Sequence, residues 1–175
     1  LFFQLLSFLT ICSLFAGCGA MYQYDYTDGP PTLAGIYTKS LVIGYDGPLK
    51  DFSEIGVVTT QPGVCLTVLD GKSASFYRTY KTSSLMPGGR FQIHLSPGIH
   101  TLSMCYRFES PQVFYYSKED VTRTLFIQKG EVIHLQSTSP SRNSWGIEFH
   151  DGSKALPTIK ADFDELIKLQ PKSKN

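Results

Sequence analysis

The chain has 175 residues, with 16 Lys and Arg, 15 Asp and Glu, and a formal net charge of +1. This length suits one domain, whose core is large enough to fold without a metal ion. The basic residues are scattered, which argues against nucleic acid as a partner, because phosphate binding needs clustered Lys and Arg.

Residues 1–17 form an uncharged apolar run that is followed by Cys18. An apolar run that ends in small residues is typical of a signal peptide. Two alternatives stay open: a secretory peptide cleaved without lipid attachment, and an uncleaved membrane anchor, for which the run lies at the short limit of spanning length. Residues 14–18, Leu-Phe-Ala-Gly-Cys, resemble the lipobox of bacterial lipoproteins.

The lipobox resemblance implies that Cys18 is acylated, with fatty acids such as palmitate, and becomes the mature N-terminus. Gly19 follows it, where an acidic residue retains enteric lipoproteins at the inner membrane. The resemblance therefore implies a lipid anchor in the outer membrane, with the protein on the periplasmic side. Residues 18–35 have no apolar period and are expected to be a tether.

Residues 36–152 carry a β pattern, in which short alternating segments end at Gly, Pro or Asp. The segment 76–80 matches this pattern less well than the others. The remaining strands are expected at 41–45, 55–59, 64–69, 91–95, 101–108, 122–127, 131–137 and 145–149.

Two of the predicted turns suggest hairpins. Ser96-Pro97-Gly98 predicts a hairpin between 91–95 and 101–108, since Pro presets one turn angle and Gly accepts a positive one. A second hairpin is expected around Lys129-Gly130. Residues 86–89, Met-Pro-Gly-Gly, are expected to form a turn.

Helical spacing is confined to residues 153–175. Four apolar residues fall at positions i, i+4, i+7 and i+8, namely Ile159, Phe163, Leu166 and Ile167. Thr158 is the expected N-cap, and Asp162, Asp164 and Glu165 are expected near the helix start, where the dipole favours acids. The apolar stripe of this helix is expected to lie on the sheet.

These elements predict a mainly β protein, an antiparallel β-sandwich or small barrel of about seven or eight strands with a short C-terminal helix. Residues 95–102, Leu-Ser-Pro-Gly-Ile-His-Thr-Leu, resemble a hairpin common in transthyretin-like and Ig-like envelope modules. Together with 45–49, 69–71 and 130–135, the layout resembles small uncharacterised proteobacterial lipoproteins with such a sandwich. That resemblance implies a fold and a location but no activity.

Cys65 and Cys105 remain once the signal peptide and Cys18 are set aside. Both fall on the non-core side of their predicted strands, so they can form a disulfide if those strands are neighbours. The bond would close a loop of about forty residues, worth roughly 4 kcal/mol in the chain-entropy model. The alternative is two free thiols.

No metal-ligand spacing and no catalytic motif is present, so neither a metal ion nor a cofactor is predicted. His94 and His134 are expected on outward faces of different strands. His100 is expected to hold the hairpin through local hydrogen bonds. Phe114, Tyr115 and Tyr116 are expected in a loop or edge, either as partner-binding aromatics or as the cover of a satellite core.

The sequence therefore predicts a lipid-anchored envelope protein whose β-sandwich is a non-catalytic binding or structural module, with a protein or the cell wall as partner. One alternative is a subunit of an envelope-spanning assembly, since the outer-membrane lipoproteins of type VI secretion machines are also transthyretin-like sandwiches. The other is a hydrolase with an unrecognised site.

Overall fold

A computed structural model of the chain describes residues 37–61, 63–81, 86–109, 114–138 and 145–169. The predicted signal peptide, Cys18 and the tether lie outside these residues. The prediction of a mainly β protein with two packed sheets and a short C-terminal helix is confirmed.

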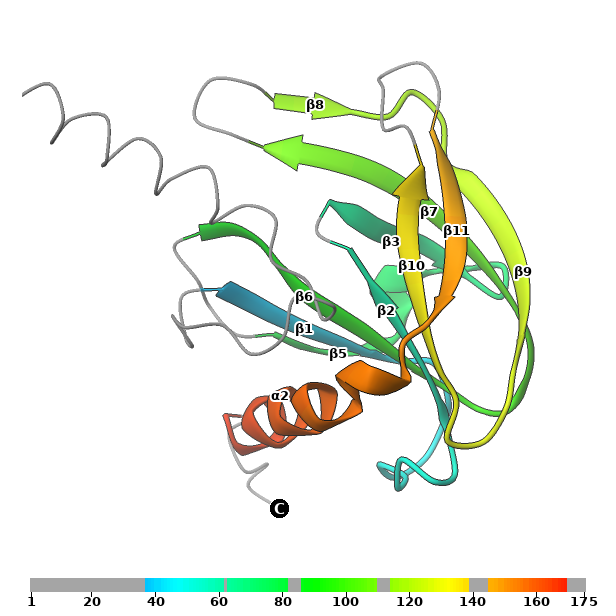
Figure 1. Cartoon of the computed structure of the whole chain (residues 1–175), viewed down its shortest axis with the longest axis vertical. Helices are drawn as coiled ribbons and strands as arrows, with labels where there is room; N and C mark the ends of the chain where they lie inside the picture. The colour runs from blue at the N-terminus through cyan, green and yellow to red at the C-terminus, as the bar shows by residue number, and fades with distance from the viewer. Residues whose placement is uncertain (1–36, 62, 82–85, 110–113, 139–144, 170–175) are drawn as a thin grey trace, which may run out of the picture.

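Eleven strands lie in the described residues, more than the seven or eight predicted (Figure 1). They form sheet A, in the order β11-β10-β2-β6-β1-β5, and sheet B, in the order β4-β3-β7-β8 with β9 also paired to β7. The strands are β1 (Tyr37–Ile43), β2 (Gly56–Thr60), β3 (Val64–Leu69), β4 (Lys72–Ser73), β5 (Arg78–Lys81), β6 (Met86–Leu95), β7 (Gly98–Glu109), β8 (Phe114–Tyr116), β9 (Val121–Ile127), β10 (Val132–Thr138) and β11 (Gly146–Asp151).

The prediction of a wholly antiparallel sandwich is wrong for sheet A. In that sheet β1 runs parallel to β6, and β10 runs parallel to β2. Both parallel pairs join segments that are distant in sequence, and local turn patterns predict pairing only between neighbouring segments. Sheet B is antiparallel in every described pairing.

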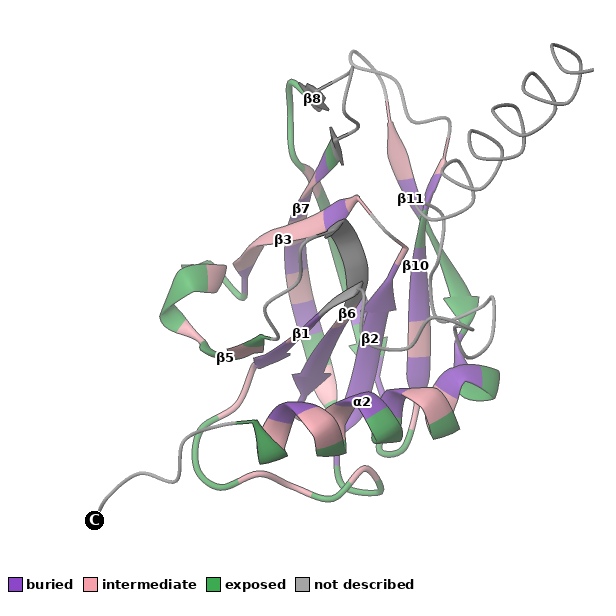
Figure 2. Cartoon of the chain, turned by 90° about the vertical axis from the view of Figure 1, so that its left-hand side faces the viewer, coloured by how far each residue is buried: buried purple, intermediate pink, exposed green. Residues whose placement is uncertain are grey.

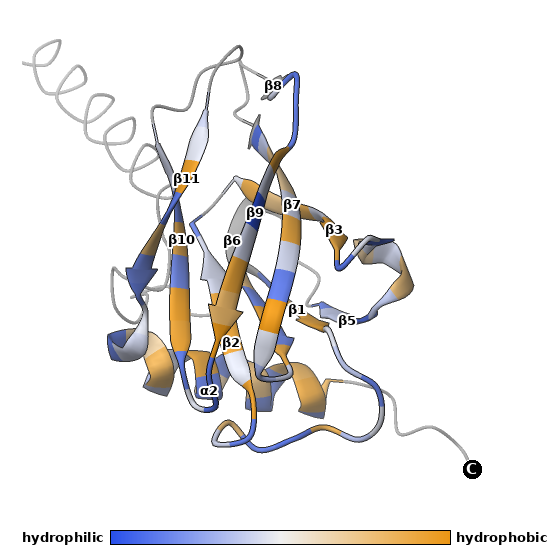
Figure 3. Cartoon of the chain, turned by 90° about the vertical axis from the view of Figure 1, so that its right-hand side faces the viewer, coloured by the Kyte–Doolittle hydropathy of each residue, from blue (hydrophilic) through white to orange (hydrophobic). Residues whose placement is uncertain are grey.

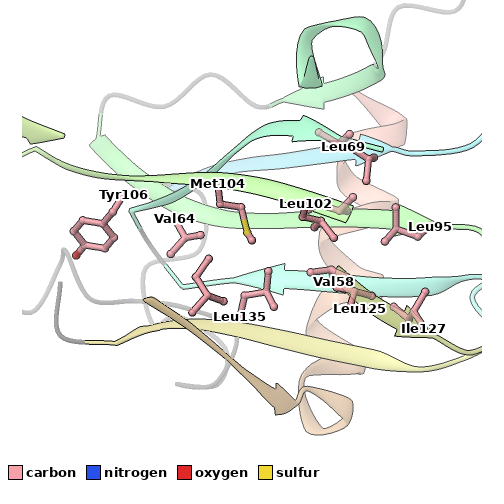
Figure 4. Close-up of a cluster of buried hydrophobic side chains, with 13 residues drawn as sticks. Val58, Val64, Leu69, Leu95, Leu102, Met104, Tyr106, Leu125, Ile127 and Leu135 are labelled. Atoms are coloured by element: carbon pink, nitrogen blue, oxygen red, sulfur yellow. The ribbon is translucent and has the colours of Figure 1, made fainter. Parts of the chain in front are cut away.

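The main core lies between the two sheets (Figure 4). Sheet A supplies aliphatic side chains such as Val58, Ile93 and Leu135, and sheet B supplies others such as Leu102 and Met104. These side chains have 0% relative exposure. Burial of one such side chain contributes roughly 1.5–3 kcal/mol, so this layer is the main source of stability.

Helix α2 (Leu156–Lys168) covers the other side of sheet A (Figure 2). Ile159 and Leu166 pack there against strand residues such as Leu41, Ile43 and Val57. The central strands of sheet A are therefore buried on both faces, and all five residues of β2 are buried. Continuous burial of this kind is expected wherever a sheet lies in the middle of three layers.

The two predicted hairpins are connections between the sheets. β6 lies in sheet A and β7 in sheet B, and β9 and β10 are divided in the same way. Gly98 has a positive φ of +144°, so the predicted bend at Ser96-Pro97-Gly98 is confirmed. Its strands then diverge into different layers because each buries its apolar face against the other across the core.

Two further local predictions are wrong. Residues 86–89 begin β6 instead of forming a turn. A register shift between β1 and β6 leaves Pro87 and Gly88 without paired residues on β1. Proline has no N–H, and at this position the sheet loses no hydrogen bond because of it. Helix α2 begins at Leu156, after a 3-10 turn at Ser153–Ala155, so Thr158 lies inside the helix and is not its cap. A second 3-10 turn, Ala74–Phe76, connects β4 to β5.

Candidate functional site

The outward side of sheet B is the one sheet face that no described element covers. We call it the open face, made of alternate residues of β3, β7 and β9: Cys65, Thr67, Ile99, Thr101, Ser103, Cys105, Thr122, Thr124 and Phe126. Figure 3 shows hydrophobic and hydrophilic positions following one another along β7, whereas β9 ends in a continuous hydrophobic stretch. The intervening residues, such as Leu102 and Met104, lie in the main core.

Hydroxyl groups line the middle of the open face and pair across the strands. The Thr101 and Thr124 hydroxyls lie 3.2 Å apart, and those of Ser103 and Thr122 lie 2.8 Å apart. The Thr67 hydroxyl donates to the Ser103 carbonyl at 2.9 Å. Cross-strand pairs of this type contribute roughly 0.2–1 kcal/mol each and hold the β7–β9 register.

An exposed apolar pair lies at one end of the open face. Ile99 and Phe126 are directly opposite each other on β7 and β9, with 73% and 61% of their surfaces exposed. Other exposed hydrophobic side chains, such as Phe76, lie on other elements. Two adjacent large apolar side chains in water are a feature of surfaces that bind another molecule.

Cys65 and Cys105 lie beyond the hydroxyl groups, toward the other end of this face. They are directly opposite each other on β3 and β7, so the condition set for pairing, that their strands be neighbours, is met. Both are partly exposed and carry thiols in the structure, and the disulfide stays a prediction. A hydrogen bond with the Cys65 thiol lowers the pKa of Cys105 to about 7.

Phe114, Tyr115 and Tyr116 form the short edge strand β8, as the prediction of a loop or edge allowed. They pair in register with Glu109, Phe108 and Arg107 of β7. Their backbone is described but their side chains are not, so their role in partner binding stays a prediction.

A buried charged pair joins the helix to sheet A. Lys39 of β1 lies 3.3 Å from the Asp162 carboxylate, and their side chains are 7% and 5% exposed. The Lys39 ammonium also donates to Glu165, which is 45% exposed. The expected place of Asp162, Asp164 and Glu165 at the helix start is therefore wrong: all three lie beyond the first turn, and Asp162 and Glu165 pair with a lysine.

His94 lies on the same helix-covered side and is fully buried, so its predicted outward position is wrong. Its Nε2 lies 2.8 Å from Gln92 Oε1, and its ring stacks on Phe163 and meets Phe52 edge to face. Burial lowers the pKa of His94 to about 3, because the imidazolium would lose its hydration there. The side chain is therefore neutral at physiological pH.

His134 was also expected on an outward face, and it too is buried, with 2% exposure. Its Nδ1 lies 3.0 Å from the Thr59 hydroxyl of the neighbouring strand β2. Its position shares the side of β10 that carries Val132, which packs on the helix side of sheet A. This contact therefore joins β10 to β2 within sheet A.

His100 clamps the connection between the sheets. Its Nδ1 lies 2.7 Å from the Asp70 carboxylate, and its Nε2 lies 2.7 Å from the Ser96 carbonyl. The Asp70 carboxylate also accepts from the Thr101 N–H at 2.8 Å. The prediction that His100 holds its turn through local hydrogen bonds is confirmed, although the strands it joins do not form a hairpin.

Sequence reasoning missed the buried polar residues because it did not identify which strands the C-terminal helix covers. Lys39, Gln92 and Asp162 have no motif, and each lies at a position typical of a solvated face. The one available signal was the apolar stripe of the helix, which requires a sheet face to pack on. That signal points to the layer but not to the individual strands beneath it.

The chain matches no protein-family model, no curated protein and no solved structure. Within the described ranges, no helix has the length and apolar character needed to cross a membrane. Among the same residues, no three His, Cys, Asp or Glu side chains are grouped so as to hold a metal ion.

Proposed function

We propose that this chain is a lipid-anchored envelope protein whose β-sandwich binds another protein through the open face. The observation that carries the proposal is the exposed Ile99–Phe126 pair next to a row of hydroxyl groups. Protein interfaces have this anatomy, an apolar or aromatic anchor surrounded by a polar rim. The central strands of sheet A, by contrast, are covered on both sides by the main core and the helix.

The proposed location of the protein is supported by the sequence alone. The Leu-Phe-Ala-Gly-Cys stretch supports acylation of Cys18, and Gly19 supports sorting to the outer membrane, facing the periplasm. Two acyl chains give stable anchoring whereas one does not. The finer fold assignment, a transthyretin-like or Ig-like module, is part of this proposal and is supported by the two packed sheets.

The binding face is tested by site-specific photo-crosslinking in intact envelopes. A photoreactive phenylalanine analogue at position 126 is expected to give a discrete protein adduct. The same analogue at Phe76, which is 83% exposed and lies on the turn before β5, is the matched control and is expected to give none. The adduct should disappear when Ile99→Asp places a charge beside position 126.

The adduct also separates the two partner classes. Destruction by protease and resistance to muramidase support a protein partner, whereas sensitivity to muramidase alone identifies the cell wall and overturns this part of the proposal. Equal labelling from positions 126 and 76, or an adduct that Ile99→Asp leaves unchanged, contradicts a specific open-face site.

The anchor has its own test. Cys18→Ser is expected to move the protein from the membrane fraction to the soluble fraction, because no acyl chain is attached. Mass spectrometry of the wild-type N-terminus should find an acylated Cys18. Continued membrane association of the variant, or an unacylated N-terminus, contradicts lipidation without affecting the crosslinking result.

A further inference from the structure

The Cys65–Cys105 pair occupies a particular position in the β3–β7 ladder. The Arg107 N–H donates to the Gly63 carbonyl at 2.8 Å, and these residues face each other one step beyond the Val64–Tyr106 pair. Hydrogen-bonded and non-hydrogen-bonded pairs alternate along an antiparallel ladder. Cys65 and Cys105 lie on the other side of the Val64–Tyr106 pair, two steps from Gly63 and Arg107, so they also form a hydrogen-bonded pair.

This position makes a disulfide possible but strained. Directly opposite Cβ atoms are about 4.5–5.5 Å apart, with hydrogen-bonded pairs at the wide end of that range. A disulfide needs Cβ atoms about 3.5–4.5 Å apart. Bridging the two cysteines therefore pulls the strands together by roughly 1 Å, and strained disulfides are more easily reduced than relaxed ones.

The surroundings of the two thiols favour reactivity. Both are partly exposed on the open face, where a second molecule has access to them. The hydrogen bond between the thiols holds the pKa of Cys105 at about 7, with Arg107 lowering the pKa and burial and Asp120 raising it. Cys105 is therefore partly a thiolate at neutral pH, and Cys65 is the neighbouring thiol that supports it.

We propose that Cys65 and Cys105 form a reversible dithiol–disulfide couple whose disulfide oxidises two thiols of a substrate at the open face. A substrate thiolate attacks the Cys105 sulfur, the Cys65–Cys105 bond breaks, and the departing Cys65 thiolate takes a proton from solvent. The second substrate thiol then loses its proton to solvent and attacks the substrate sulfur of the mixed disulfide, which releases Cys105 as a thiolate. The couple gains two electrons, and the substrate, which becomes a disulfide, loses them.

The first test measures alkylation of Cys105 by iodoacetamide at pH 7 in the reduced full-length chain in detergent. Peptide mass spectrometry separates Cys105 from Cys12, Cys18 and Cys65. Cys65→Ala removes the hydrogen-bond donor, so the rate is expected to fall about fivefold, because the gain in thiolate nucleophilicity offsets part of the lost thiolate fraction. Cys65→Ser keeps a donor and should retain the wild-type rate. Equal rates in all three proteins, or equal losses in both variants, overturn the role of Cys65.

The second test equilibrates the same chain with mixtures of reduced and oxidised glutathione. Dithiol and disulfide forms are both expected across these mixtures, and a glutathione adduct is expected on Cys105 in Cys65→Ser. The matched variant Cys105→Ser should accumulate much less adduct on Cys65. A bridge that stays fully oxidised in a large excess of reduced glutathione is a structural disulfide and overturns the proposal. Thiols that stay reduced in a large excess of oxidised glutathione also overturn it.

Discussion

Replacement of Lys39 by methionine tests how the helix is held on sheet A. The change leaves the buried Asp162 carboxylate without the cation that lies 3.3 Å away. At that distance the attraction is about 5 kcal/mol for an effective dielectric constant of about 20. Breaking a buried ion pair by removing one partner costs about 3–5 kcal/mol, and we expect a loss of unfolding free energy in this range. Glu165 is 45% exposed, so loss of its contact adds little.

The assay is urea unfolding followed by fluorescence of Trp145, the one tryptophan of the chain. Its Nε1 donates to the Glu119 carbonyl at 3.0 Å, so its environment changes on unfolding. With a slope of about 2 kcal/mol per M, the midpoint should fall by about 2 M. The exposed Lys118→Met is the matched control and should change stability by less than about 0.5 kcal/mol.

A double variant tests whether the loss of stability comes from the unpaired charge of Asp162 or from packing. Lys39→Met combined with Asp162→Leu removes both buried charges, so it should recover most of the stability lost in the single variant. A single variant that costs less than about 1 kcal/mol would show that Asp162 is solvated or otherwise compensated. A double variant as unstable as the single one would place the effect in packing instead of charge.

Three further predictions concern stability. The pKa of His94 is lowered to about 3 in the folded protein, so as the pH falls the His94 imidazole is protonated in the unfolded chain before it is protonated in the folded one. The unfolding free energy should therefore drop by up to about 1.4 kcal/mol per pH unit between about pH 6 and 4. His94→Gln should flatten that slope in urea titrations. Asp70→Ala removes the contacts to His100 and Thr101 and should cost about 3 kcal/mol by the same assay. Gly56→Ala places a Cβ 2.3 Å from an Ile127 carbon and should lower stability by about 1–3 kcal/mol in thermal unfolding.

Matched controls separate these mechanisms from general damage. His150 is 46% exposed, so His150→Ala should leave both the pH slope and the stability almost unchanged. Gly47→Ala meets no atom within 4 Å, and its φ of +89° carries only local backbone strain, so it should cost less than Gly56→Ala. An unchanged pH slope in His94→Gln would assign the acid sensitivity to other groups. A neutral Gly56→Ala would mean that Ile127 moves without loss of packing.

Local patterns were sufficient for most of the elements. Alternation along 101–108 predicted β7 and the side on which Cys105 lies, and the spacing of Ile159 and Leu166 predicted the apolar side of α2. Both signals are short-range, since a period of two or of 3.6 residues reports which side of an element is buried. The relative orientation of Cys65 and Cys105 within their strands could be predicted for the same reason.

Partnership between strands was decided only in the tertiary structure. Ser96-Pro97-Gly98 supports a tight turn, but the turn does not determine whether β7 pairs with β6 or crosses to the other sheet. The parallel pairs β1–β6 and β10–β2, and the helix that buries His94 and Lys39, depend on residues far apart in sequence. Alternation shows which side of a strand is buried, but it does not show which other element packs against that side. The packing partner is the one that gives the largest total burial of apolar area, and that total depends on the whole chain.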